Sequence, residues 1–531
     1  MNFQAPKGTF DIVPVQLDSK DPDDNRRQMV LWNKLEKAAR ECFSRFGYEE
    51  IRPSIIEYTN LFYKSSGDTT DVVEKEMFTF DAWVHFVDEL SLVLTGKEFK
   101  VPIPYKLLGN TPGVEIRGES LEYSPDVAVC HALSLVQEEV RKEKVGSGRE
   151  VFHQLCTLND EKARSFWSGL SEKKKAELTR ILDDHLESGL ASLSLRPELT
   201  PGTIRALIEQ GLFAKKNFWK VWYLGPAFRK ERPQKGRYRQ FTQIGVEAVG
   251  SPDPLIDAET MVLFSEILKA VGVTAWELRV NSIGCKECRP QYREALREWI
   301  RPRLETLDEN CRRRFERNVF RILDCKVDAD KLKDAPKSID YLCPACKQHM
   351  AVVEQALGAC QVPYRVDPRI VRGLDYYTRT VYEFSSSKLG AQDAIAGGGR
   401  YDTLVGSMGG PDVGSVGFAA GVERILLAME GDASAPVPDF FAVAVAGVSR
   451  SDVFKAVVGL RRKGLSGDLD FEARSVKAQM RSANKSGARY AVFIGPEEIQ
   501  KGVLKLKDMK DGSERAVLVD EAVQILQGGK P

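Results

Sequence analysis

The sequence predicts an α+β protein built from several domains. Its 531 residues are too many for one ordinary hydrophobic core, so about three or four domains are expected. Residues 28–47 repeat apolar side chains with helical periodicity, whereas two strand-like runs flank the basic stretch FRKERPQKGRYRQFTQIGVE at 228–247. From about residue 440, strand-like and helical runs alternate, which indicates a small α/β domain.

Composition narrows the class of protein. Hydrophobic residues make up 43% of the chain and charged residues 29%, and no apolar run approaches the roughly 20 residues that cross a bilayer. The N-terminus has no basic region followed by an apolar stretch, so we expect no secretory signal and no membrane partner. Ten cysteines in so long a chain fit a reducing cytosol better than a disulfide scaffold. Because the net charge is +1, any site for a polyanion must be a local patch.

The basic stretch is such a patch, with six Lys or Arg and two Glu in twenty residues. If its flanks pair as antiparallel strands, residues two apart share a face. One face of the second strand then carries Arg239, Phe241, Gln243, Gly245 and Glu247, and the other face is mostly apolar. A polar face with glycines suits the floor of a pocket, and the cationic connection suits a phosphate-bearing ligand. From charge alone, a solvated basic hairpin is an equal alternative.

Two further segments place an arginine beside glycines. VRGLDYYTRT carries Arg372, and GSVGFAAGVER places three glycines before Arg424 at the start of an expected helix. Together with Arg229 they indicate repeated contact with phosphate, because the planar guanidinium group binds phosphate through two donors. Neither a Walker nor a Rossmann glycine motif occurs, so those nucleotide sites are not expected.

At these residues the chain resembles the class II aminoacyl-tRNA synthetases, and specifically the histidyl-tRNA synthetase family. The basic stretch resembles motif 2, GVERILLAM resembles motif 3, and FGYEEIRPSIIE resembles motif 1. RGLDYYTRTVYEF and GGGRYD resemble the two histidine-specific signatures. The resemblance implies a catalytic antiparallel sheet of six or seven strands flanked by helices, a helical insertion domain and a C-terminal α/β anticodon-binding domain.

The resemblance also implies a function. The expected activity is ATP-dependent ligation of L-histidine to tRNA(His) through a histidyl-adenylate, with Mg²⁺ accompanying ATP, in a cytoplasmic homodimer. The carboxylate that attacks the α-phosphorus is already ionised, so this step needs positioning and cations rather than a general base. In agreement, none of the five histidines lies in these motifs.

Residue roles follow from the resemblance, motif by motif. The residues expected to act on the phosphates are Arg229, Arg372 and Arg424, and Arg372 also touches the histidine carboxylate. ATP is expected to lie against Arg229, Glu231, Arg237, Arg372 and Arg424. The expected histidine pocket is formed by Glu198, Leu199, Thr200, Gln243, Glu247, Tyr376, Tyr377 and Tyr401. Gln234 is the candidate for contact with the tRNA acceptor stem, and Leu199 stands where many family members have glycine.

The C-terminal region offers a second RNA contact. In ARSVKAQMRSANKSGARY the basic residues Arg474, Lys477, Arg481 and Lys485 recur every three or four positions and share one helical face. Taken alone, such a face is more often simply solvated. The resemblance to the family's anticodon-binding domain favours contact with tRNA.

Two CxxC pairs, Cys285 with Cys288 and Cys343 with Cys346, have the spacing of zinc ligands. The gap between the pairs is wider than in the usual zinc ribbon, and Cys311 and Cys325 lie within it. A structural Zn²⁺ on the four cysteines is one hypothesis, and reduced, part-buried thiols are the other. A catalytic zinc ion is not expected, because adenylate formation gives it no task.

The segment at 85–188 departs from the family pattern, because about a hundred residues separate MFTF from LRPE. The sequence does not indicate its role. The expected domain order is the first part of the catalytic core (1–84), this insertion (85–188), the core with motif 2 (189–282), the cysteine-rich insertion (283–360), the core with motif 3 (361–430), a linker (431–439) and the anticodon-binding domain (440–531).

Two alternatives to an active ligase remain. A catalytically silent paralogue would bind histidine or tRNA to regulate another enzyme, but such proteins tend to lose motif arginines, the RGLDYY signature or the C-terminal domain. This chain keeps all three. A different class II amino-acid specificity would require replacement of Glu247 and the tyrosine pair.

Overall fold

The chain divides into two units, Met1–Glu430 and Gly431–Pro531. Their structure, a computed structural model, describes residues 5–12, 29–66, 70, 73, 76–80, 93–94, 132, 148–157, 161–187, 193–325, 327–370, 376–390, 393–429 and 437–528. Of the linker predicted at 431–439, only the last three residues are described. Within the described ranges, no helix combines the length and the apolar character needed to cross a bilayer.

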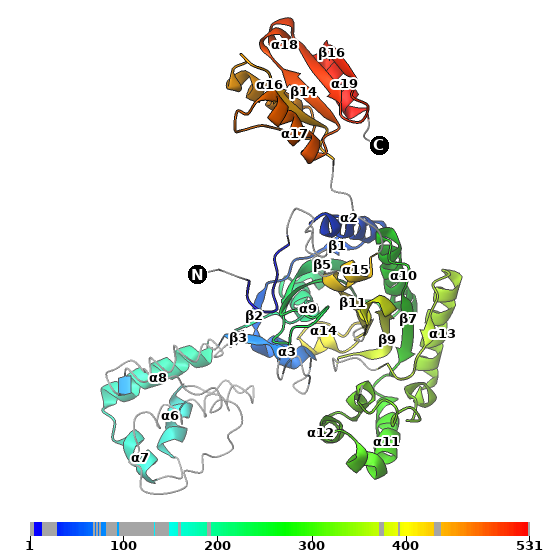
Figure 1. The fold of residues 1–531 in the computed structure, drawn as a ribbon. Coiled ribbons are helices and arrows are strands. Elements are labelled where there is room, and N and C mark those ends of the chain that lie inside the picture. The colour runs from blue at the N-terminus through cyan, green and yellow to red at the C-terminus, as the bar shows by residue number, and fades with distance from the viewer. Residues whose placement is uncertain are drawn as a thin grey trace. The chain divides into compact units, whose positions relative to one another are not determined.

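The described part of the first unit is organised by an eight-stranded sheet in the order β1-β5-β6-β11-β10-β9-β7-β8 (Figure 1). The six inner strands run antiparallel to their neighbours, and the two-residue strands β1 and β8 pair in parallel at the edges. The two edge strands account for the difference from the six or seven antiparallel strands expected. The strands are β1 (Glu49–Glu50), β5 (Trp219–Phe228), β6 (Gln240–Val249), β7 (Glu277–Ser282), β8 (Arg365–Val366), β9 (Thr378–Ser385), β10 (Ala394–Arg400) and β11 (Ser415–Gly421).

One face of this sheet forms the main hydrophobic core. Ile244, Val246 and Ala248 of β6 are buried in it, as their period-two pattern predicted. The helices that cover this face are α2 (Met29–Arg45), α10 (Pro254–Val271) and α13 (Pro344–Ala359). The first turn of α10 is capped by Asp253, whose side chain accepts a hydrogen bond from the Leu255 amide at 2.9 Å.

A smaller sheet follows the first helix. Gly47, just beyond α2, has a φ of +74°, the left-handed conformation in which helices commonly end. The proline-containing run after β1 leads to β2, which pairs with β4, and β4 pairs with β3. These elements are β2 (Ile56–Tyr58), α3 (Thr59–Ser66), β3 (Phe78–Phe80) and β4 (Leu193–Leu195).

The opposite face of the large sheet carries a second apolar cluster and the candidate site. Ile204, Leu207 and Leu404 bury their side chains here against Val221 and Val249 of the sheet. The helices on this side and at the end of β11 are α9 (Thr200–Glu209), α14 (Leu404–Ser407) and α15 (Val422–Ala428). Because α15 follows β11 directly, the arginine of GVER lies in its first turn, as predicted.

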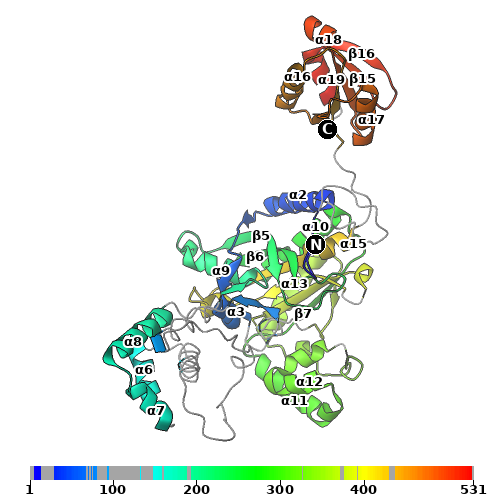
Figure 2. The ribbon, with the colours of Figure 1, turned by 60° about the vertical axis from the view of Figure 1, so that its left-hand side comes forward.

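A helical insertion connects β7 to β8, as the resemblance implied (Figure 2). Its helices α11 and α12 share a core that includes Tyr292, Leu296 and Phe315. This core is separate from that of the sheet, so the insertion can be regarded as a module with its own packing. Its elements before α13 are α11 (Arg289–Ile300), η4 (Arg301–Thr306), α12 (Glu309–Arg317), η5 (Val319–Asp324) and η6 (Ser338–Tyr341).

Part of the predicted 85–188 insertion is described, and that part is helical. Trp167 is fully buried there and contacts the rings of Phe152 and Phe166 at centroid distances of 6.1 and 5.5 Å. These contacts give the segment a small apolar core. Its helices are α6 (Gly148–Cys156), α7 (Glu161–Ser168) and α8 (Glu172–Glu187).

The second unit is a five-stranded sheet in the order β13-β12-β14-β15-β16, with helices on both faces. This arrangement matches the α/β domain that the alternating runs predicted. Its strands are β12 (Phe440–Ala444), β13 (Gly467–Leu469), β14 (Tyr490–Ile494), β15 (Val503–Asp508) and β16 (Glu514–Leu518). Its helices are α16 (Arg450–Arg462), α17 (Val476–Ser486), α18 (Pro496–Lys501) and α19 (Val519–Gln527).

Candidate active site

A cavity of about 240 Å³ lies on the sheet face opposite the main core. Residues of β6, β10 and β11 line it together with the start of α9, the first turn of α15 and the loop between β5 and β6. The sequence motifs come from distant parts of the chain, yet most of the predicted site residues meet here. Those that line the cavity are Glu198, Thr200, Arg229, Glu231, Arg237, Gln243, Glu247, Tyr376, Tyr377, Tyr401 and Arg424.

One end of the cavity is acidic and buried. Glu247 on β6 accepts hydrogen bonds from the hydroxyl of Tyr223, at 3.2 Å, and from the hydroxyl of Tyr401. Glu198, just before α9, accepts one from the Tyr376 hydroxyl at 3.3 Å. Both carboxyl groups are buried, at 1% and 3% exposure. This end therefore combines two carboxyl groups with tyrosines that hold them in place.

Burial raises the pKa of Glu247 to about 8. Hydrogen bonds from Tyr401, Thr200 and Tyr223 act in the opposite direction, and the nearby Glu198 adds to the increase. In the protein alone, this carboxyl group therefore holds a proton at pH 7. Such a group suits a ligand with a basic nitrogen, because the carboxyl group and the nitrogen can share one proton in a strong hydrogen bond.

Glycines make room for these carboxyl and hydroxyl groups. Gly417 on β11 pairs directly with Glu247, and a Cβ atom there would lie 2.0 Å from the Glu247 Oε2 atom. Gly245 pairs with Tyr223, and a Cβ atom there would lie 2.5 Å from the tyrosine hydroxyl. Any side chain at either position would displace the polar groups from the acidic end.

The other end of the cavity is basic. The Arg424 side chain is oriented by two hydrogen bonds that it donates. Its Nε atom donates to the Gly236 carbonyl at 2.9 Å, and its Nη1 atom donates to the Ala394 carbonyl at 2.7 Å. Burial lowers the pKa of Arg424, and the positive charges of Arg237 and Arg229 lower it further. Three guanidinium groups therefore repel one another here, which favours an anionic ligand.

Glu231 lies among these arginines. It is 3.1 Å from the Arg237 guanidinium and 3.8 Å from that of Arg229. Arg229 is further oriented by a 3.0 Å hydrogen bond from Nε to the Pro197 carbonyl and by the ring of Phe241, 5.2 Å from its guanidinium carbon. The cation of Arg229 is thus held in place before any ligand binds.

The start of α9 is tied to β6 beside the predicted histidine pocket. The Leu199 amide donates to the Gln243 side-chain carbonyl at 3.2 Å, which connects the helix start to β6. Leu199 has a φ of −103°, ordinary for leucine, so this position does not require glycine. Its side chain packs with Tyr223 and Ala227 rather than lining the cavity. Of the predicted histidine-binding residues, Leu199 alone does not line the cavity.

Two further predicted residues are not among those that line the cavity in the described part of the chain. Arg372 falls in 371–375, outside the described residues, so its prediction is untested. Gln234 is exposed and bridges to Arg237 through two main-chain hydrogen bonds of 3.1 and 2.8 Å, at the end of the loop between β5 and β6. Gln234 is thus exposed and outside the cavity lining, so a large ligand has access to it.

The basic helical face predicted in the C-terminal unit forms with three of its four residues, and the fourth, Arg474, lies outside the helix. Lys477, Arg481 and Lys485 are exposed on α17, whereas Ala483 is buried against the sheet. Arg474 lies just before the helix and is paired with Asp470 at 2.6 Å. This pairing neutralises part of the predicted charge, so the three helical residues carry most of the cationic face.

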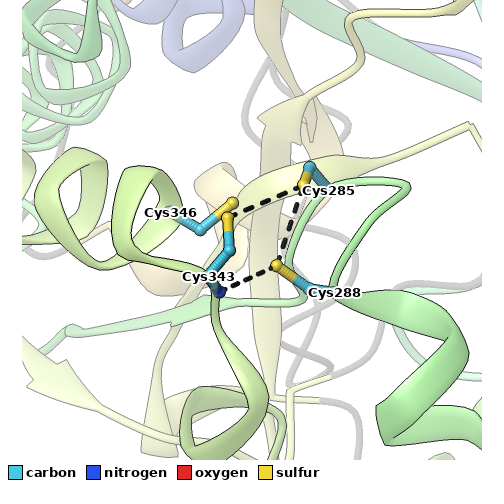
Figure 3. A group of neighbouring side chains, drawn as sticks. All are labelled: Cys285, Cys288, Cys343 and Cys346. Atoms are coloured by element: carbon cyan, nitrogen blue, oxygen red, sulfur yellow. Dashed lines mark hydrogen bonds between the residues drawn. The ribbon is translucent and has the colours of Figure 1, made fainter.

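The four predicted zinc ligands also meet, although their two pairs are far apart in sequence. Their sulfur atoms all lie within 4.8 Å of one another (Figure 3). Cys311 and Cys325 lie elsewhere in the insertion, where their sulfurs and a carboxylate oxygen of Asp328 form a separate group. The described cysteines are free thiols.

The sequence analysis missed two residues of the site. Tyr223 on β5 pairs with Gly245, which belongs to the polar face of β6 identified from the sequence, so the same alternation applied to both strands would have found it. Glu423, next to Arg424, lines the cavity and accepts a hydrogen bond from the Thr242 amide at 2.8 Å. Nothing in a single sequence distinguishes this glutamate from a surface residue of a helix.

Comparison with known proteins gives the family. A family model described as histidyl-tRNA synthetase matches residues 160–425, and one described as an anticodon binding domain matches residues 443–528. The histidine–tRNA ligase of Trichlorobacter lovleyi is 36% identical over 524 residues, which cover 98% of this chain and 97% of that protein. This chain belongs to the histidyl-tRNA synthetase family.

Other histidyl-tRNA synthetases agree with this assignment. The histidine–tRNA ligase of Syntrophotalea carbinolica is 35% identical over 530 residues, covering 99% of this chain and 98% of that protein. The crystal structure of apo S. aureus histidyl-tRNA synthetase matches with a TM-score of 0.64 at 25% identity, covering 99% of this chain and all of that one. The family resemblance and the α+β fold with a C-terminal α/β domain are thereby confirmed.

Proposed function

We propose that this chain is a histidine–tRNA ligase. In the first step, the histidine carboxylate attacks the α-phosphorus of ATP and pyrophosphate leaves. In the second step, a terminal ribose hydroxyl of tRNA(His) attacks the acyl carbon and AMP leaves. The observation that carries the proposal is one cavity with buried carboxyl groups at one end and three arginines at the other. A cationic amino acid and a polyphosphate could therefore bind next to each other on the same sheet.

The acidic end is the proposed histidine pocket. Glu247 would bind the imidazole, with its carboxyl group oriented by two tyrosine hydroxyls. Glu198 and Thr200, with Gln243, would hold the α-amine, and Tyr376, Tyr377 and Tyr401 would line the pocket. A buried acid left without a partner by an apolar amino acid would cost several kcal/mol, which gives selectivity for histidine.

The basic end is the proposed ATP site. Arg229, Arg237 and Arg424 would contact the phosphates, and Arg372 remains the predicted partner of the α-phosphate. Glu231 and Glu423 are carboxylates on the cavity wall, the ligand type that Mg²⁺ prefers, and so this end fits ATP bound as its Mg²⁺ complex. When bound, Mg²⁺ supplies charge neutralisation to the phosphate oxygens. The arginines fix the phosphates and stabilise their developing charge.

Contacts with tRNA(His) are proposed in two places. Gln234 would meet the acceptor stem from the exposed end of its loop, and Lys477, Arg481 and Lys485, with Arg474, would meet the anticodon region. The exposure of these side chains supports the assignment. Since tRNA charging takes place where translation occurs, we also propose that the protein is cytoplasmic.

A homodimer is proposed through the motif 1 region. Ile56 and Tyr58 on β2 are 51% and 58% exposed, and Leu193, which pairs with Tyr58 from β4, is 38% exposed. Ile55 and Tyr63 are also exposed nearby in the chain. Neighbouring exposed apolar side chains on one small sheet favour a protein–protein contact. Sedimentation at several concentrations would test it, with Tyr58→Asp expected to yield monomers.

The four cysteines add a structural Zn²⁺ to this proposal, without a part in the chemistry. Thiolates are the preferred ligands of structural zinc, and a site with four cysteine ligands keeps no open position for a substrate.

The test is histidine-dependent exchange of pyrophosphate into ATP, followed by histidylation of a tRNA(His) transcript. We expect exchange with histidine alone among the amino acids, and transfer to tRNA(His). Absence of exchange from folded protein that still binds ATP would favour the silent paralogue. Exchange with a different amino acid would favour another class II specificity.

A further inference from the structure

The cysteine cluster has the dimensions of a zinc site. The Sγ atom of Cys285 lies 3.7 Å from that of Cys288 and 3.9 Å from that of Cys343 (Figure 3). Four sulfurs bound tetrahedrally about 2.3 Å from one Zn²⁺ ion lie about 3.8 Å apart. A disulfide would require about 2.05 Å. The spacing therefore fits shared coordination of a metal rather than oxidation.

The backbone around the cluster is shaped for close approach of the sulfurs. Gly284 has a φ of +72°, and a Cβ atom there would lie 2.5 Å from the Cβ atom of Cys288. The Cys343 amide donates to the Cys288 sulfur at 3.1 Å, the kind of outer contact that orients a metal-bound thiolate. Cys288 and Cys346 are buried, at 4% and 1% exposure, so they are shielded from solvent.

We propose that one Zn²⁺ ion bound by Cys285, Cys288, Cys343 and Cys346 closes the base of the helical insertion and positions the histidine pocket. The first pair lies between β7 and α11, and the second pair begins α13. The ion thus joins the two ends of residues 289–342, the part of the insertion that carries α11 and α12. The positioning role rests on the proposed function.

One route from the cluster to the pocket runs through β9. The Arg379 amide donates to the Gly284 carbonyl at 2.9 Å, and the Ile283 amide donates to the Arg379 carbonyl at 2.8 Å. Arg379 has a φ of +50°, a conformation that costs a non-glycine residue energy and is maintained by these bonds. Arg379 follows Tyr377, a lining residue of the cavity, by two positions. Displacement of the Cys285 turn would therefore move the tyrosine pair.

A second route runs through α13. His349 lies one turn after Cys346 and places Nε2 2.7 Å from a carboxylate oxygen of Asp257. Asp257 also accepts from the Arg400 Nε at 3.0 Å, and both side chains are fully buried. Arg400 directly precedes Tyr401, which donates to the carboxyl group at the acidic end. The start of α13 is thus connected to the histidine pocket by buried polar contacts.

The experiment begins with the metal content of the full chain, purified without chelators. We expect one Zn²⁺ per chain, and its loss in Cys343→Ala. Cys343→His should retain zinc, because imidazole replaces thiolate in many tetrahedral sites. Cys360→Ser is the matched control: it removes an exposed thiol at the other end of α13 and should change nothing.

The positioning role is tested by kinetics and hydrogen exchange. In Cys343→Ala the KM for histidine should rise about tenfold, as for a coupling between neighbouring sites, with the KM for ATP nearly constant. Amides of 283–284 and 378–380 should lose protection from exchange, and Cys343→His should restore both properties. Wild-type protein that contains no zinc when purified without chelators would overturn the site. Zinc loss with an unchanged KM for histidine would overturn the positioning role. Wild-type protein that binds zinc but catalyses no exchange would overturn the proposed function and leave the metal site standing.

Discussion

Replacement of Glu247 by Gln tests the histidine pocket most directly. The change preserves the size of a side chain that is 1% exposed and fixed by the hydroxyls of Tyr223 and Tyr401. It removes the acid and substitutes an amide nitrogen that cannot accept a hydrogen bond. The pocket therefore loses its hydrogen bond to a charged partner, but not its volume.

The magnitude follows from that single interaction. A hydrogen bond involving a charged group contributes about 1.5–3 kcal/mol, and each 1.4 kcal/mol is a factor of ten in affinity. The KM for histidine in pyrophosphate exchange should therefore rise about 10- to 150-fold in Glu247→Gln, with little change in the KM for ATP. Glu277→Gln is the control, because Glu277 pairs with Arg365 on β8 at the edge of the sheet and does not line the cavity.

The raised pKa of Glu247 adds a pH signature. Between the ordinary pKa of histidine, about 6.5, and that of Glu247, about 8, a neutral imidazole meets a protonated carboxyl group, and the pair holds the one proton it shares. Below this pH range the imidazole is protonated as well, so the pair holds one proton more than it can share. Above this range the carboxyl group is ionised while the imidazole is neutral, so the shared proton is lost. The kcat/KM for histidine should thus be bell-shaped, and Glu247→Gln should lose the alkaline limb. A folded Gln variant whose KM and pH profile match those of the wild type would refute the reasoning.

Three other predictions follow from the same geometry. Gly417→Ala places a Cβ atom 2.0 Å from a carboxylate oxygen and 2.3 Å from a main-chain carbonyl, so thermal unfolding should show a loss of about 1–3 kcal/mol and exchange should show weakened histidine binding. Arg229→Gln should raise the KM for ATP about tenfold or more and leave the KM for histidine unchanged; equal effects on both would contradict its place at the basic end. Lys477→Ala combined with Arg481→Ala should raise the KM for tRNA and reduce its salt dependence without affecting exchange, whereas Lys501→Ala on α18, paired with a glutamate, should affect neither.

Much of the site could be predicted because its local signals are strong. Alternation along β6 separated Glu247 from the core residues beside it, and the glycines before Arg424 marked a strand that runs directly into a helix. The placement of Leu199 was less predictable, because its contribution is a main-chain amide that any residue supplies. Tyr223 follows the same alternation, but its part in the site is a hydrogen bond to Glu247 across two strands, which an uncharged side chain does not signal in the sequence.

By itself, the sequence determined which segments carry charge, glycine and thiols, where several helical and strand-like runs lie, and which family the chain resembles. These properties depend on neighbours along the chain, and a local pattern records them. Only the tertiary structure decided that Glu247 lies with Tyr223 and Tyr401 beneath a protein surface, and that burial raises its pKa to about 8. It also decided that two cysteine pairs some 55 residues apart converge on one point. The burial of Glu247 and the meeting of the cysteine pairs depend on strand order and on packing between distant segments, so no single stretch of the sequence predicts them.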